Sequence, residues 1–145
     1  MEQIGLVLFY GITVFDDIRT KQVRTVELII FASIGVILNV VNKDMNFLSA
    51  LSAVAIGAIL AIISTLTKGK LGMGDALIIA VSGLYLGFKN TLALVWLSSL
   101  MAAGYGLLAL RKYDNKRNIE LPFVPFLLLA YMLMLIRQHM GGLLF

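Results

Sequence analysis

Six apolar segments separated by short polar connections account for most of this chain. They run roughly through residues 4–18, 26–41, 47–66, 75–88, 91–110 and 122–136. Hydrophobic residues make up 60% of the 145 residues and charged residues 14%, whereas soluble domains are about 45–50% apolar and about 25% charged. A soluble core of this size cannot bury so much apolar surface. We therefore predict an all-α polytopic membrane protein with six transmembrane helices, forming a single membrane-embedded domain over residues 1–145.

The basic residues are spread unevenly over the connections between these segments. Nine of the 12 Lys and Arg residues lie in the first, third and fifth connections, namely Arg19, Lys21, Arg24, Lys68, Lys70, Arg111, Lys112, Lys116 and Arg117. Because cytoplasmic loops are enriched in Lys and Arg, we predict that these connections are cytoplasmic and that both termini lie outside. The net charge of +4 then reflects membrane topology, and no nucleic-acid partner is expected.

Residues that commonly bind metals are scarce in this sequence. The chain has no cysteine and a single histidine, His139, near its C-terminal end. This composition excludes disulfides, thiol nucleophiles, cysteine-ligated zinc and histidine-based metal clusters. We predict neither a metal nor a cofactor.

Two aspartates at the edges of apolar segments are the candidate functional residues. Asp17 ends the first segment and Asp75 begins the fourth, and two complete segments lie between them. Both are therefore expected on the cytoplasmic side. A helix from Met1 to Asp17 rises about 24 Å at ~1.5 Å per residue, so Asp17 is expected near the cytoplasmic boundary of a hydrocarbon layer ~30 Å thick. A charged side chain at such a position is costly and points to function.

Paired carboxyl groups at the same depth suggest aspartyl protease chemistry. One ionised carboxyl removes a proton from water, and one neutral carboxyl protonates or polarises the scissile carbonyl. The helix dipole favours the anion at Asp75, where a helix begins, and disfavours it at Asp17, where a helix ends. Asp75 is thus the expected base and Asp17 the expected acid, although the proton belongs to the pair and the assignment stays open.

Three motifs carry a resemblance to a known family. Asp17-Ile18-Arg19-Thr20-Lys21-Gln22-Val23 resembles the first active-site motif of the type IV prepilin peptidases. Gly72-Met73-Gly74-Asp75 resembles their second motif, GxGD. The run from Leu121 to Leu127, with Pro122, Phe123 and Pro125, resembles their late Pro-Phe segment.

The resemblance implies a membrane aspartyl endopeptidase that cleaves the short basic leader of prepilin-like precursors. It implies catalytic roles for Asp17 and Asp75 and a supporting role for the other motif residues, which are Gly72, Gly74, Pro122, Phe123 and Pro125. The expected location is the bacterial cytoplasmic membrane, with the active site on its cytoplasmic side. The expected partners are the lipid bilayer and the precursor within it. The chain has no room for the methyltransferase insert of the large family forms, so it resembles the short, peptidase-only form of tight-adherence pilus systems.

Two positions depart from the family pattern. Arg24 stands where the family usually has proline, and Leu77 stands where it often has lysine. Neither change removes a carboxylate, so the substrate preference is the property most open to question.

Other notable residues have structural interpretations. Asp16 points about 100° away from Asp17 around a helix, and is expected to lie outside the chemistry. Glu27 is expected to have a structural partner such as Arg24. Ala53, Gly57 and Ala61 recur every four residues, which predicts a face for close helix contact.

Two alternative functions remain open from the sequence. The same aspartate pair could act on another membrane substrate, such as a different signal-bearing precursor or a small peptide. The chain could instead be a non-catalytic membrane scaffold or a small transporter subunit, with both aspartates as ion or proton ligands. Transporters place ionisable residues near the middle of the membrane, whereas both aspartates here lie at one edge.

Overall fold

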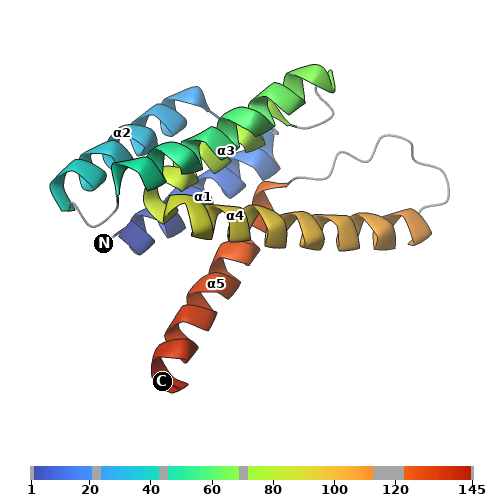
Figure 1. The fold of residues 1–145 in the computed structure, drawn as a ribbon. Helices are drawn as coiled ribbons and strands as arrows, with labels where there is room; N and C mark the ends of the chain where they lie inside the picture. The colour runs from blue at the N-terminus through green and yellow to red at the C-terminus, as the bar shows by residue number, and fades with distance from the viewer. Residues whose placement is uncertain (1, 21–23, 43–45, 69–71, 113–122, 145) are drawn as a thin grey trace.

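The structure, a computed structural model, describes residues 2–20, 24–42, 46–68, 72–112 and 123–144. The described chain forms five helices, as the all-α prediction requires (Figure 1). They are α1 (Glu2–Thr20), α2 (Thr25–Asn42), α3 (Phe47–Leu66), α4 (Met73–Lys112) and α5 (Val124–Leu144). The first three helices and the first half of α4 run side by side, and α5 leaves them at a steep angle (Figure 1).

A sharp kink at Gly87 divides α4 into two halves. Gly87 has φ 73° and ψ 175°, a conformation that glycine adopts readily because it has no Cβ. The Phe88 N–H donates a hydrogen bond to Ser49 Oγ at the start of α3 (3.2 Å). Figure 1 shows the yellow-green first half of α4 lying along α3 and the gold second half running back in another direction.

This kink corrects the predicted boundary between the fourth and fifth apolar segments. The sequence suggested a connection at Lys89 and Asn90, but both residues lie within the helix after the kink. There the Asn90 side chain donates to the Leu86 carbonyl (3.2 Å) and the Thr91 hydroxyl to the Gly87 carbonyl (2.7 Å). The break occurs at Gly87 because its positive φ, and not the polarity of its neighbours, reverses the backbone.

Small residues bring α3 and the first half of α4 into close contact. A Cβ added to Gly57 would lie 2.6 Å from the Cα of Ala80. On the facing helix, a Cβ added to Gly83 would lie 2.9 Å from the carbonyl carbon of Ala53. The predicted close-contact face is therefore confirmed at Ala53 and Gly57.

This contact predicts opposite effects for two glycine substitutions. Gly57→Ala should destabilise the protein by about 1–3 kcal/mol, because the new methyl group meets the backbone of α4. Gly104→Ala should be neutral or stabilising by up to about 1 kcal/mol through helix propensity, because nothing lies within 4 Å of its added Cβ. Thermal unfolding of both variants in detergent measures the difference. Equal unfolding midpoints would contradict the close α3–α4 contact.

The first half of α4 is also tied to α1 and α2 through polar groups inside apolar surroundings. Tyr10 of α1 hydrogen-bonds Ser82 of α4 (2.5 Å), and both side chains are buried. The Tyr85 hydroxyl donates to the Phe31 carbonyl of α2 (2.6 Å). A hydrogen bond of this kind is difficult to replace inside a membrane, because lipid offers no partner. The first half of α4 is therefore the central element of the bundle.

The outer surface of the described helices is apolar, as expected for a membrane protein. Three described segments are long and apolar enough to cross a bilayer, namely α3, α4 and Val124–Gly141 of α5. Thr25–Val41 of α2 is a shorter apolar helix. Large apolar side chains such as Leu8, Leu48, Trp96 and Leu107 are more than half exposed. The predicted count of six spans, with both termini outside, stays a prediction.

Candidate active site

The register between α1 and α4 brings Asp17 and Asp75 to the same end of the bundle. The two helices run in opposite directions and meet at the Tyr10–Ser82 hydrogen bond. Asp17 lies seven residues after Tyr10, and Asp75 lies seven residues before Ser82. Seven residues make nearly two helical turns and about 10 Å of rise. Asp17 therefore lies on the same face of α1 as Tyr10, and Asp75 lies on the same face of α4 as Ser82. Both aspartates are the same distance along the helix axis from the Tyr10–Ser82 hydrogen bond.

The two carboxyl groups interact electrostatically across this interface. They lie close enough for the charge of Asp17 to act on Asp75. Both residues are half-buried, and no hydrogen bond from the described residues reaches the buried Oδ2 of Asp17. Neighbouring carboxyl groups in such surroundings favour a state in which one is ionised and the other protonated. The structure thus places both aspartates at one end of the bundle, while their direct pairing and their catalytic role stay predictions.

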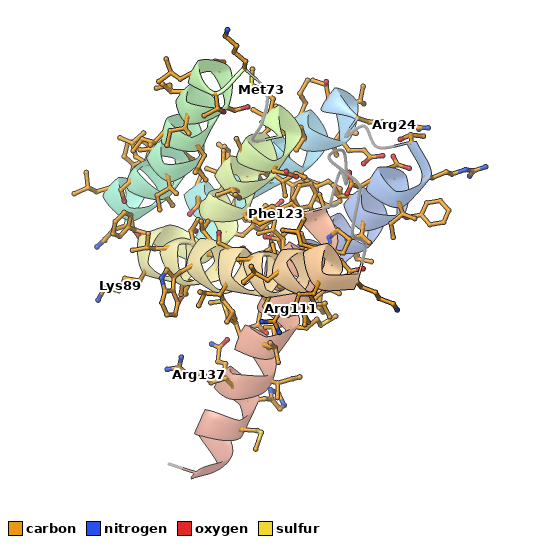
Figure 2. All side chains as sticks on the ribbon, turned by 90° about the vertical axis from the view of Figure 1, so that its right-hand side faces the viewer. Arg24, Met73, Lys89, Arg111, Phe123 and Arg137 are labelled. Carbon is orange, nitrogen blue, oxygen red and sulfur yellow. The ribbon has the colours of Figure 1, made fainter. Side chains whose placement is uncertain are left out.

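Asp75 occupies the third position of α4, where helix geometry favours an anion. The helix begins with the Ala76 N–H donating to the Gly72 carbonyl (3.3 Å). The first N–H groups of a helix lack carbonyl partners, and they give this end a partial positive charge. In Figure 2 the labelled Met73 marks this end of α4, in the upper part of the view together with Arg24.

Gly72 leaves the space that the Asp75 carboxyl group occupies. A Cβ added to Gly72 would lie 2.6 Å from Oδ2 of Asp75 and 3.2 Å from its Cγ. The carboxyl group therefore folds back over the residue that precedes the helix. Gly74, the other glycine of the motif, is the half-buried second residue of α4.

Asp16 belongs to a separate polar cluster on another face of α1. It is 9% exposed, and its Oδ2 lies 3.4 Å from Nε of Arg24, just before α2. Glu27, in the first turn of α2, lies near Asp16, and the charges of Asp16 and Arg24 both act on its carboxyl group. The sequence predicted Arg24 as the partner of Glu27 and did not predict the ion pair between Arg24 and Asp16. The available signal was the opposite charges of Asp16 and Arg24 on either side of a short connection.

The late Pro-Phe segment starts α5. Pro122 lies outside the described residues. The Phe123 carbonyl accepts hydrogen bonds from the N–H groups of Phe126 (3.0 Å) and Leu127 (3.2 Å). Pro125 falls in the first turn, where a missing N–H costs no helical hydrogen bond. The Phe126 ring packs against Tyr105 of α4, with centroids 5.6 Å apart. These contacts position α5 against α4.

Comparison with known proteins gives one match. A family model, the type IV leader peptidase family, matches residues 4–107. The matched range contains Asp17, Gly72, Gly74 and Asp75 and ends before the late Pro-Phe segment. No curated protein matches the chain, and no solved structure matches it.

Proposed function

Since the chain belongs to the type IV leader peptidase family, we propose that it is an aspartyl endopeptidase that removes the short basic leader of prepilin-like precursors. The meeting of Asp17 and Asp75 at one end of an antiparallel helix pair is the observation that carries this proposal. The late Pro-Phe residues Phe123 and Pro125 support the pair indirectly, by starting α5.

The proposed reaction begins with one carboxyl ionised and the other protonated. Asp75, favoured as the anion at a helix N-terminus, removes a proton from a water molecule, and the oxygen of that water attacks the scissile carbonyl carbon. Asp17 donates its proton to the carbonyl oxygen. When the tetrahedral intermediate collapses, the C–N bond breaks and the proton held by Asp75 passes to the leaving amine. The alcohol proton of the intermediate returns to Asp17, so the pair regains its starting state.

The surroundings of the pair fit a precursor with a basic leader and an apolar helix. Asp17 lies three residues before the end of α1, and Asp75 two residues after the start of α4. Below this level α1 exposes large apolar side chains, including Leu8 and Ile12. An apolar substrate helix can lie against such a surface in the lipid, while the leader stays in the polar phase.

The distribution of charge supports a cytoplasmic location for this end. Arg19, Arg24 and Lys68 lie at the ends of α1, α2 and α3 that share the level of the aspartates. Lys89 lies at the opposite end of the first half of α4, next to the kink (Figure 2). Under the positive-inside rule, we infer that the active site faces the cytoplasm from the bacterial cytoplasmic membrane. We also infer that the chain acts as a single peptidase domain.

Reconstitution with a matched precursor tests the proposal. The purified full chain, in vesicles with a pilin precursor from the same genome, is expected to release one leader peptide. Mass spectrometry should locate a single cut at the junction between the basic leader and the apolar helix. An intact precursor after prolonged incubation with folded protein would contradict the proposed activity. Cuts scattered within the apolar helix would contradict the proposed depth of the site.

A further inference from the structure

An ion pair between a buried carboxylate and an exposed arginine joins the last two turns of α1 to the start of α2, at the end of the bundle that holds the proposed catalytic pair. Asp16 Oδ2 and Arg24 Nε are 3.4 Å apart. The Asp16 side chain is 12% exposed, whereas that of Arg24 is 68% exposed. Exposed ion pairs contribute little to stability, but a buried carboxylate deprived of a cationic partner is costly. The main effect of the contact is therefore on the position of Asp16, and not on the stability of the protein.

Glu27 completes the connection from the α2 side. Its carboxyl group lies near that of Asp16, and the charge of Arg24 also acts on it. The Glu27 N–H also donates to the Arg24 carbonyl (3.1 Å), which begins α2. The Asp16–Arg24 ion pair thus connects the end of α1 to the start of α2, and Glu27 lies beside it.

The position of Asp16 in α1 determines what this connection can affect. Asp16 and Asp17 are adjacent residues in the last two turns of α1, where the carbonyl groups begin to lack helical partners and the helix can fray. Asp16 pairs with Arg24, while Asp17 lies on a different face of the helix, near enough to Asp75 for its charge to act on that carboxyl group. Movement of this part of the helix away from α2 would carry the Asp17 carboxyl with it.

We propose that Asp16, Arg24 and Glu27 are positioning residues, which hold the end of α1 so that the Asp17 carboxyl stays directed at Asp75. This inference rests on the proposed peptidase function. None of the three residues needs to touch the substrate. Their loss should lower the rate of the chemical step and leave precursor binding largely intact.

Steady-state cleavage by variants at Arg24 tests the effect on catalysis. Arg24→Gln is expected to lower kcat about tenfold, because small misplacements of a catalytic group cost this much or more. KM should remain within about twofold, since no substrate contact is lost. Arg24→Lys should restore most of kcat. Lys68→Gln, which removes an exposed positive charge from the same end of the bundle, is the matched control and should leave both constants unchanged.

A double-mutant comparison asks whether Arg24 acts through Asp16. If it does, Asp16→Asn combined with Arg24→Gln should be no worse than the more impaired single variant, because coupled residues are not additive. Additive losses would overturn the proposal, as would a rise in KM without a fall in kcat.

A second readout does not depend on activity. The chain has no cysteine, so Ile18→Cys and Leu77→Cys can carry spin labels on exposed sites of α1 and α4. The distribution of distances between the two spin labels should be narrow in the chain that keeps Arg24, broader in Arg24→Gln and narrow again in Arg24→Lys. An unchanged distribution in Arg24→Gln would overturn the positioning role. Broadening in a chain that cleaves no precursor would retain the positioning role and remove the peptidase function.

Discussion

Replacing either Asp17 or Asp75 by asparagine is expected to abolish cleavage of a matched precursor. Asparagine keeps the volume and much of the hydrogen bonding of aspartate, but it cannot accept and return a proton. Because both carboxyl groups act on one water molecule in the proposed reaction, the loss of either should cost about as much as the loss of both. The double variant should therefore be no slower than the single variants. The mobility shift of the co-expressed precursor on a gel measures each outcome.

The interpretation of this experiment depends on folded, membrane-inserted protein. Asp44→Asn is the matched control, because Asp44 lies in the second connection, which the charge pattern assigns to the opposite side. It should process the precursor at the normal rate. Full processing by the Asp75→Asn protein would eliminate the two-carboxyl mechanism and favour a non-catalytic scaffold that depends on a co-purifying peptidase.

Gly72→Ala is expected to cause the second largest loss, about 100-fold in kcat, by displacing the Asp75 carboxyl group. The added methyl group would lie 2.6 Å from Oδ2 of Asp75, closer than two such atoms can approach. The side chain of Asp75 can rotate away, so the fold should persist while the catalytic geometry is lost. Steady-state kinetics and thermal unfolding should therefore disagree, with a large fall in kcat and a small shift in Tm.

Gly11→Ala provides the comparison for this substitution. Gly11 lies in α1, and nothing approaches within 4 Å of a Cβ added there. Its alanine variant should cleave at the normal rate. If Gly72→Ala also cleaved normally, the Asp75 carboxyl would not need the position it has in this structure, and its assignment as the base would be lost.

The sequence predicted the parts of the fold that follow from hydrophobic segments and missed those that follow from backbone geometry. Counting segments between Asp17 and Asp75 was enough to place them at one end, because an even number of crossings returns the chain to the same side. The kink at Gly87 could not be located in this way. Its neighbours Lys89 and Asn90 are polar and suggested a connection, but the reversal depends on the positive φ of one glycine.

In the candidate site, too, residue types and spacing could be recognised from the sequence, whereas contacts between distant residues could not. Asp17, Asp75 and the glycines were recognisable because their types and spacing are unusual in an apolar chain. The Tyr10–Ser82 pair was not, because a single hydroxyl group within an apolar segment gives no indication of its partner. The Asp16–Arg24 ion pair was missed because Arg24 was read only as a departure from the family pattern and as a partner of Glu27. The roles of Phe123 and Pro125 in the reaction stay predictions.

In the proposed reaction, the Tyr10–Ser82 hydrogen bond would fix the depth at which a peptide bond is cut. Sliding α1 along α4 by one turn, about 5.4 Å, would break this bond and separate Asp17 from Asp75 at the same time, because both pairs share one register. A hydroxyl group released into the apolar interior finds no substitute partner, so such sliding is unfavourable. If the proposed function holds, the distance between the cut and the membrane surface is therefore set by the register of α1 and α4 and not by the connections. The length of the connections outside can vary without shifting it.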